Sequence, residues 1–333
     1  MKAAVIGTGY WGPNLIRNFL SLDDIDSVVA CDLDEARLAK MRKAFYGLEV
    51  SGDPTEVISR KDIDIVIIAT PVSTHFEIAK QSLLAGKHCF IEKPMTSSVA
   101  EAEELIDLAA KKNLTLFVDH TFIYTGAVRK MKEVVVSGRL GEIYYFDSVR
   151  VNLGLFQHDV NVIWDLAPHD LSIMGYLLDQ KPRAVSAIGS CHVGNGLEDI
   201  AYLTLEFENN MIAHFHVNWL APVKIRKTLI GGTKSMIIYD DTETSEKVKI
   251  YDKGIDVTSR EGVYQTLVQY RTGDMLSPKL DQEEALSVGS RHFLDCIKNG
   301  TRPITDGEAG LDVVRILEAS AVSIKDRGRL IEL

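Results

Sequence analysis

The chain has 333 residues, of which 46% are hydrophobic and 25% are charged, a composition typical of a globular protein with a sizeable core and two domains. Its formal net charge of -10 argues against a general nucleic-acid binder, because contact with phosphates needs a basic surface. The sequence contains no long uncharged apolar run and no signal-peptide pattern, so we expect no membrane span and a cytoplasmic location.

The first predicted element is a short apolar strand that leads through a glycine-rich turn into a helix, in the stretch AAVIGTGYWGPNLIRNFL. Gly7 permits the tight turn, Gly9 lets a pyrophosphate approach the backbone, and Gly12 allows the helix to pack closely on the strand. We therefore expect a dinucleotide to bind this loop, with contacts from Tyr10 and Trp11 as well.

A second strand, SVVACDLD, ends at Asp32. A carboxylate at this place accepts hydrogen bonds from the ribose hydroxyls and repels a 2′-phosphate, so the sequence favours NAD over NADP. Arg37 follows closely and can offset part of that repulsion. The alternative is a glycine-rich turn that binds nothing, and the combination of strand, helix and acidic residue argues against it.

Strands and helices continue to alternate to about residue 120, which predicts a parallel sheet and a Rossmann domain over residues 1–120. The strand in KDIDIVIIATP lacks polar alternation, as expected of a strand covered on both faces. Ligands of such sheets bind at the carboxyl ends of the strands. We therefore expect the cofactor to contact Thr70, Pro71, His75, Glu92 and Lys93, and the substrate to contact Lys93 and His120.

The tripeptide Glu92-Lys93-Pro94 places two charges at the end of a buried strand. The simpler interpretation is a solvated ion pair. In a partly dry site, however, the lysine ammonium can hold a carbonyl or alkoxide oxygen beside a nicotinamide, and the sequence suggests this catalytic role.

From about residue 121 strand patterns dominate, which predicts a second domain over residues 121–333 built on an open, mainly antiparallel sheet. A helix should end at Gly138, a hairpin should turn at Asn209-Asn210, and helices should close the chain over 280–299 and 306–327. One face of the sheet should pack on helices. The other, with the stretch HFHVNW, is a candidate subunit interface, and residues 240–280 are expected to hold a mobile substrate loop.

No metal site is expected. His214 and His216 point the same way on a strand, but no third ligand is evident nearby. The four cysteines are far apart and form no CxxC pair, which favours free thiols over a disulfide framework or a zinc site.

The stretch NVIWDLAPHDL, residues 161–171, carries three titratable groups in an apolar run. Pro168 suits the first turn of a helix, which puts His169 at the positive end of the helix dipole, where a neutral imidazole is favoured. Asp165 can then orient the ring, and Asp170 is expected to be a first-turn carboxylate. The alternative is that Asp165 is only an N-cap and His169 a satisfied buried histidine.

Several stretches together resemble the Gfo/Idh/MocA oxidoreductase family over essentially the whole chain: GTGYWGPNLIRNF, ATPVSTHFEIAKQSLLAGKHCFIEKP, AVRKMKEVVVSGRLGEI, DGEAGLDVVRILEASAVSI and the pair Asp165-x-x-x-His169. The resemblance implies a Rossmann domain, a second α/β domain with a large open sheet, and a homodimer or homotetramer. It also implies that Lys93 and His169 flank the reacting substrate carbon with Asp165 alongside. GYWGPN, WDLAPHDLSI and YRTGDMLSPKLD are most similar to members that act on nucleotide-linked sugars.

We therefore predict an NAD-dependent oxidoreductase that transfers a hydride between nicotinamide and a secondary alcohol of a sugar, at C3 of a nucleotide-linked sugar in a surface-polysaccharide pathway. The alternatives are a dehydrogenase of inositol or a free sugar, an NAD-dependent glycosidase, and a catalytically silent NAD-binding regulator. The residues expected to contact substrate are Lys93, His120, Tyr124, Arg150, Asp165 and His169. A diphosphate should be held by some of Arg129, Arg150, Lys224, Arg226 and Lys279.

Overall fold

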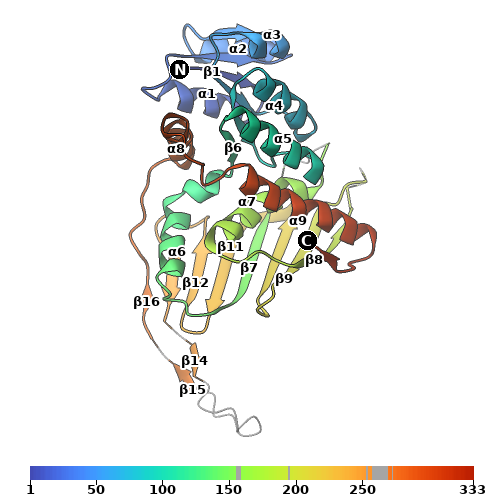
Figure 1. The fold of residues 1–333 in the computed structure, drawn as a ribbon. Helices are drawn as coiled ribbons and strands as arrows, with labels where there is room; N and C mark the ends of the chain where they lie inside the picture. Colours follow the sequence, from blue (N-terminus) through green and yellow to red (C-terminus); the bar gives the residue numbers. More distant parts are fainter. Residues whose placement is uncertain (155–158, 194–195, 253, 257–268, 272) are drawn as a thin grey trace. The chain divides into compact units, whose positions relative to one another are not determined.

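The computed structural model describes residues 1–154, 159–193, 196–252, 254–256, 269–271 and 273–333, and the chain forms two compact units (Figure 1). The first unit holds Met1–Tyr124 and Glu283–Glu318, and the second holds Thr125–Gln282 and Ala319–Leu333. The sequence predicts a single boundary after residue 120, whereas the chain returns to the first unit near its end. Part of the predicted mobile loop at 240–280, residues 253, 257–268 and 272, lies outside the described residues.

The first unit is built on a six-stranded sheet in which every neighbouring pair of strands is parallel. The strand order 3-2-1-4-5-6 is that of the Rossmann fold, whose order reverses between β1 and β4. The predicted Rossmann architecture is therefore confirmed. In sheet order the strands are β3 (Glu49–Ser51), β2 (Ser27–Cys31), β1 (Lys2–Ile6), β4 (Ile65–Ile68), β5 (His88–Glu92) and β6 (Leu116–Asp119).

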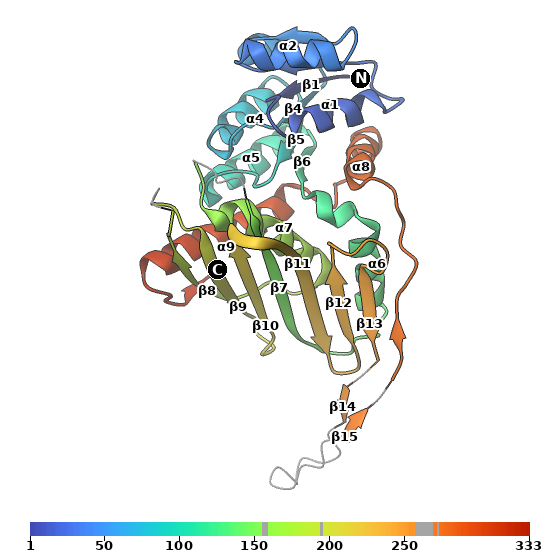
Figure 2. The ribbon, with the colours of Figure 1, turned by 180° about the vertical axis from the view of Figure 1, so that it is seen from behind.

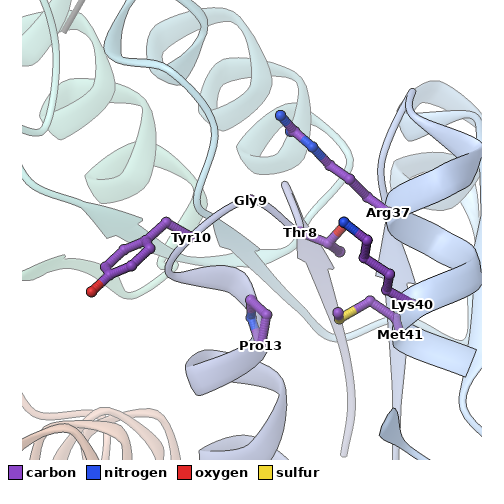
Figure 3. A pocket seen from close by; sticks show the side chains of 7 residues that line it. All are labelled: Thr8, Gly9, Tyr10, Pro13, Arg37, Lys40 and Met41. Atoms are coloured by element: carbon purple, nitrogen blue, oxygen red, sulfur yellow. The ribbon is translucent and has the colours of Figure 1, made fainter. Parts of the chain in front are cut away.

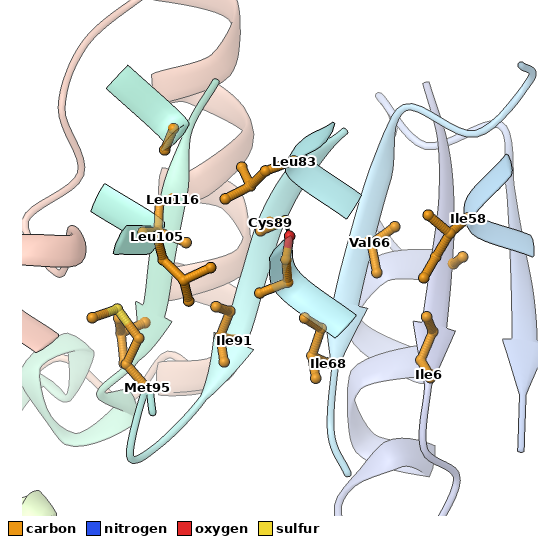
Figure 4. Packing of buried hydrophobic residues seen from close by; sticks show 14 of the residues in the cluster. Ile6, Ile58, Val66, Ile68, Leu83, Cys89, Ile91, Met95, Leu105 and Leu116 are labelled. Carbon is orange, nitrogen blue, oxygen red and sulfur yellow. Dashed lines mark hydrogen bonds between the residues drawn. The ribbon is translucent and has the colours of Figure 1, made fainter. Parts of the chain in front are cut away.

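Helices pack on this sheet and bury most residues of its central strands. Every residue of β4 is buried, as the unbroken run of isoleucine and valine predicts for a strand covered on both faces. Figure 4 shows part of the resulting core, where Val66 and Ile91 from strands lie near Leu83 and Leu105 from helices. The helices of this unit are α1 (Gly12–Leu20), α2 (Glu35–Ala44), α3 (Pro54–Ser59), α4 (His75–Leu84), α5 (Val99–Lys112), α8 (Ala285–Asn299), the first part of α9 (Gly307–Lys325), and the 3-10 helices η1 (Val72–Thr74) and η2 (Thr121–Tyr124).

The returning segment completes an aromatic cluster in the first unit. The ring of Phe90 on β5 stacks on that of Phe117 on β6, with centroids 4.5 Å apart. Phe293 of α8 packs against both rings, at 5.5 Å from Phe90 and 5.4 Å from Phe117, and Phe19 of α1 meets Phe90 edge-on. Such aromatic pairs contribute beyond the area they bury, so α8 is part of the core of this unit.

The second unit is built on a nine-stranded sheet, antiparallel except for the pair β7 and β10. This confirms the predicted mainly antiparallel sheet. The predicted turn at Asn209-Asn210 joins β9 to β10, and Asn210 has the positive φ of 63° that such a turn requires. In sheet order the strands are β16 (Met275–Leu276), β13 (Val248–Tyr251), β12 (Met236–Asp240), β11 (Leu220–Gly232), β7 (Ile143–Leu153), β10 (Ile212–Asn218), β9 (Ile200–Glu206), β8 (Ala184–Ser190) and β17 (Ile331–Glu332), while β14 (Gly254–Asp256) and β15 (Gln269–Arg271) pair separately.

Helices α6 (Gly126–Val136) and α7 (Val162–Leu177) lie on one face of the nine-stranded sheet, and Figure 2 shows the opposite face without a covering helix in the described part of this unit. The stretch HFHVNW divides between the faces because side chains alternate along a strand. Phe215 and Trp219 are 1% exposed and belong to the core, so their predicted place on the open face is wrong. His214 and His216 lie on the open face.

His214 and His216 stack on Tyr202 from the neighbouring strand, and the Tyr202 ring centroid lies 4.4 Å from that of His216. In the described part of the chain, no group of three or more His, Cys, Asp or Glu side chains is arranged to hold a metal ion. None of the four cysteines forms a disulfide with another described residue. No helix of the described residues combines the length and the apolar character needed to cross a bilayer.

Candidate functional site

The glycine-rich loop between β1 and α1 depends on close backbone contacts. Gly7 has a φ of +98°, and a Cβ there would lie 2.5 Å from the carbonyl oxygen of Ala69. A Cβ on Gly12 would lie 2.3 Å from the carbonyl oxygen of Gly7, so only glycine lets α1 begin this close to the loop. A Cβ on Gly9 would meet only the Arg37 guanidinium, at 3.7 Å. The backbone at Gly9 is therefore open to a ligand.

Asp32 follows β2 with its carboxylate next to this loop. Its Oδ2 accepts hydrogen bonds from the backbone N–H and the hydroxyl of Thr8, at 2.7 and 2.9 Å, and its Oδ1 accepts one from the backbone N–H of Asp34 at 2.9 Å. Burial alone would raise the pKa of Asp32, but these hydrogen bonds outweigh burial and lower it. Asp32 is therefore ionised at neutral pH, as recognition of ribose hydroxyls requires.

A pocket of about 300 Å³ opens beside Gly9 (Figure 3), and its lining residues are Thr8, Gly9, Tyr10, Pro13, Arg37, Lys40 and Met41. Arg37 and Lys40 extend into this region from α2, and the Arg37 guanidinium lies 3.6 Å from the Asp32 carboxylate. The open loop, the ionised carboxylate and the pocket fit the ribose and pyrophosphate of a dinucleotide.

His75, predicted to contact the cofactor, is buried at the start of α4. Its Nδ1 lies 2.9 Å from the carbonyl oxygen of Pro94, and its Nε2 lies 2.9 Å from that of Thr70. Burial lowers the pKa of His75, so the ring is neutral and donates to one carbonyl only. It connects the end of β4 with the turn after Lys93, and its direct contact with a cofactor stays a prediction.

His120 follows β6 and is 1% exposed. Neither ring nitrogen has a hydrogen-bond partner among the residues that the structure describes. Burial, and then the positive charge of Lys93, lowers the pKa of His120 to about 3. A neutral imidazole near Lys93 can both donate and accept a hydrogen bond, which suits the predicted contact with a substrate hydroxyl.

Tyr124, also predicted to contact substrate, lies in the core of the first unit. It is 2% exposed, its hydroxyl lies 3.0 Å from that of Thr305, and its ring stacks on Phe117 with centroids 5.8 Å apart. Burial raises the pKa of Tyr124. Its hydroxyl is used within the protein, so this placement gives the predicted substrate contact no support.

The helix that carries Asp165 and His169 begins earlier than the sequence predicts. Helix α7 is capped by Asn161, whose side chain accepts hydrogen bonds from the second and third helical N–H groups. Asp165 therefore lies in the first turn, Pro168 lies inside the helix, and His169 follows it. The predicted opening-turn position of Pro168 and His169 is wrong because Asn161 is the stronger helix-start signal. The helix dipole thus gives no reason for a neutral His169, and Asp165 is not the N-cap.

A side chain from the nine-stranded sheet holds the Asp165 carboxylate in place. Its Oδ2 accepts a hydrogen bond of 3.0 Å from the indole Nε1 of Trp219, which lies between β10 and β11. Trp219 is 1% exposed, and its backbone N–H donates to the carbonyl of Asp199. The spacing of four residues puts Asp165 and His169 on one side of α7, and the predicted orienting role of Asp165 stays a prediction.

Arg150, predicted to contact substrate, forms a buried bidentate ion pair with Asp170. Arg150 Nε lies 2.6 Å from Asp170 Oδ2 and Nη2 lies 2.9 Å from Oδ1, and the two side chains are 2% and 5% exposed. Asp170 is therefore not the first-turn carboxylate that the sequence suggests. Pro168 removes one helical hydrogen bond, and the ion pair joins α7 to β7 two residues further along.

The basic residues predicted to hold a diphosphate fall into two groups. Arg129 and Arg226 pair with Asp281 and Asp241, while Lys224 and Lys279 are exposed. The sequence reasoning missed Trp219 and Asp119. Asp119 could have been predicted from the sequence, because the rule that selects His120 at the carboxyl end of a strand also selects the neighbouring Asp119.

Comparison with known proteins agrees with this geometry. Residues 1–120 match the model of the GFO_IDH_MocA oxidoreductase family with its NAD-binding Rossmann fold, and residues 128–238 match the GFO/IDH/MocA C-terminal domain. The chain belongs to the Gfo/Idh/MocA family. It is accordingly an NAD-binding oxidoreductase with the two-part architecture of that family.

Relatives of different substrate classes are about equally similar to this Gfo/Idh/MocA protein. A UDP-N-acetylglucosamine 3-dehydrogenase of Acidithiobacillus ferrooxidans is 26% identical over 94% of this chain and 94% of that protein. A myo-inositol 2-dehydrogenase of Thermotoga maritima is 25% identical over 98% and 97%. The structure of GenD2 from gentamicin A biosynthesis, in complex with NAD, superimposes with a TM-score of 0.84 at 22% identity and covers 100% of this chain and 96% of that one.

The hydrogen bond between Trp219 and Asp165 can be removed with little change of volume. Trp219→Phe keeps a large apolar ring but leaves Asp165 without the indole donor, so we expect a loss of about 1–2 kcal/mol in the free energy of unfolding, measured in urea. Trp164→Phe, on α7 but without this bond to Asp165, is the matched control. Equal stability of the two variants would contradict the assignment.

Removing one partner of the Arg150–Asp170 ion pair should lower the free energy of unfolding more than removing both partners. Asp170→Leu leaves a buried guanidinium without its carboxylate and should lower the free energy of unfolding by about 3–5 kcal/mol. The double variant Arg150→Met/Asp170→Leu should recover most of that loss, because no buried charge remains uncompensated. Urea unfolding measures both variants, and a double variant as unstable as the single one contradicts the expectation.

Proposed function

We propose that this protein oxidises a secondary alcohol of a sugar, with C3 of a nucleotide-linked sugar as the first candidate. The observation that carries the proposal is Lys93, which follows β5 at the carboxyl edge of a dinucleotide-binding sheet, next to the neutral ring of His120. Membership of an oxidoreductase family supports the reaction class.

Each catalytic side chain has a separate task in the proposed reaction. When bound, NAD supplies the hydride acceptor. His169 takes the hydroxyl proton of the substrate, and Lys93 donates a hydrogen bond to the same oxygen as it becomes a carbonyl. Asp165 orients the His169 ring, and His120 donates to or accepts from a second substrate hydroxyl.

The substrate class rests on the relatives and on charge. Similarity to the UDP-N-acetylglucosamine 3-dehydrogenase supports a nucleotide-linked sugar, and the exposed Lys224 and Lys279 offer charge for a diphosphate. Similarity to the myo-inositol dehydrogenase and the net charge of -10 support a neutral polyol as the second candidate. The presence of Lys93, Asp165 and His169 together argues against a silent regulator.

A panel of substrates tests this function. The purified protein with NAD should reduce the cofactor with UDP-linked sugars or with inositol, followed by absorbance, with product analysis to detect hidden redox cycling. Lys93→Ala and His169→Asn should each lower kcat by about 10²- to 10⁴-fold, while the Kd for NAD, measured by calorimetry, stays within a few fold. Loss of NAD binding in Lys93→Ala would give Lys93 a structural role, and no turnover with either substrate class would contradict the proposal.

We also propose that two copies associate through the open face of the nine-stranded sheet. Ile188, Tyr202 and His216 are cross-strand neighbours on this face, and Ile188 and Tyr202 are exposed large side chains in the single chain. An apolar and aromatic surface of this kind is typical of an interface.

Tyr202→Arg should place a charge in this interface and weaken association by about 30-fold or more, as for a hot-spot residue. Sedimentation velocity over a range of concentrations measures the change. Tyr46→Arg is the matched control, because Tyr46 is fully exposed in the first unit. A monomeric unsubstituted protein, or equal masses for the two variants, contradicts the proposed interface.

A further inference from the structure

Two carboxyl side chains lie together at the carboxyl edge of the Rossmann sheet. Glu92 ends β5 and Asp119 ends β6, and the two residues are register partners on adjacent parallel strands. Glu92 Oε1 and Asp119 Oδ2 are buried, and apart from the other carboxyl neither oxygen has a hydrogen-bond partner among the residues that the structure describes. The side chains are close enough for a hydrogen bond with each other. Because ionised carboxylates only accept, that bond requires a proton.

We propose that Glu92 and Asp119 share one proton at neutral pH and present a single negative charge to Lys93, so that they act together as positioning residues for its ammonium group. The inference rests on the proposed function only for its catalytic consequence. The shared proton itself is a property of the protein without substrate.

The surroundings of the two residues favour one proton and one charge. Burial, and then the charge of Asp119, raises the pKa of Glu92 well above its ordinary value. Burial also raises the pKa of Asp119, although hydrogen bonds from Glu92 and Thr121 favour its ionised form, and the Thr121 hydroxyl lies 2.9 Å from Asp119 Oδ1. The hydrogen bond from the Thr121 hydroxyl to Asp119 Oδ1 favours the negative charge on Asp119, and the shared proton is then held towards Glu92.

Lys93 is the charged group that acts on both carboxyls. Its charge lowers the pKa of each, and its backbone N–H favours the ionised form of Glu92. Among the described residues, the other side chains that act on the carboxyl pair are uncharged at physiological pH: Trp11 before α1, and Thr121 and Tyr124 on η2. The rings of His75 and His120, whose pKa values are lowered, lie close to Lys93. One negative charge thus balances one ammonium at this edge of the sheet.

The shared proton predicts the direction of a pH dependence. Between the ordinary pKa of a glutamate and the raised pKa of Glu92, the native protein holds one proton that the unfolded chain releases. The unfolding equilibrium constant contributed by this site should therefore rise by up to about tenfold per pH unit as pH increases through that window. Buried histidines with lowered pKa act in the opposite direction below about pH 6.5, so a comparison of variants is needed.

Substituting each carboxyl by its amide tests the shared proton and the shared negative charge in separate experiments. Gln at position 92 mimics a protonated glutamate, so Glu92→Gln should be more stable than the unsubstituted protein at pH 8 and should converge with it towards pH 5. Glu77→Gln, an exposed carboxyl on α4, is the control and should show no such convergence. Infrared difference spectra of the unsubstituted protein at neutral pH should show the carbonyl stretch of a protonated carboxyl, and Glu92→Gln should lack it.

Activity then tests the link with Lys93. Glu92→Gln and Asp119→Asn each leave one carboxyl opposite Lys93, so each should lose less kcat than the double variant. The double variant Glu92→Gln/Asp119→Asn has no charge opposite Lys93 and should lose about 10²-fold or more in kcat, with little change in the Kd for NAD. A purely structural role would lower the stability of the single variants and would leave no such gap between single and double.

Each experimental outcome decides one part of the proposal. Absence of the infrared band, or no pH-dependent difference in stability between Glu92→Gln and the unsubstituted protein, overturns the shared proton. Equal loss of kcat in either single variant and in the double overturns the shared charge. If no substrate is turned over at all, the proposed function fails while the infrared and unfolding measurements still decide the protonation of the carboxyl pair.

Discussion

Burial of the parallel strands on both faces is the constraint from which the cofactor-binding half of this protein follows. Strands such as β4 have no face on which a polar side chain can reach water, so polar groups emerge only where the strands end. The parallel pairing puts those ends at one edge, and Asp32, Lys93 and His120 all follow strands there. Asp32 and His120 are buried at that edge, and their protonation states are set by their immediate neighbours.

Two carboxyl groups at this edge of the sheet, Asp32 and Glu92, have opposite protonation states. Asp32 is surrounded by donors from Thr8 and Asp34 and keeps its charge. Glu92 faces another carboxyl and retains a proton. The difference lies in the number of donors within reach and not in the degree of burial alone.

The order of elements could be predicted from the sequence because their patterns are local: the glycine turn, the apolar run of β4 and the Asn209-Asn210 hairpin. The start of α7 was misplaced because Pro168 is also a helix-start signal, and Asn161 outcompetes it. The internal hydrogen bonds of Arg150 and Tyr124 could not be predicted because their partners, Asp170 and Thr305, are distant in sequence. Residue type and spacing locate side chains at strand ends, whereas only packing shows which of them are already satisfied.

The return of Glu283–Glu318 to the first unit has a consequence for how the chain folds during synthesis. When Met1–Tyr124 has left the ribosome, the parallel sheet is complete, yet the rings of Phe90 and Phe117 still lack Phe293 as a neighbour. More than 150 further residues must be synthesised before Phe293 can cover this apolar surface. That synthesis takes roughly ten seconds or more at ordinary translation rates. The nascent nucleotide-binding half thus exposes part of its own core until α8 has been synthesised.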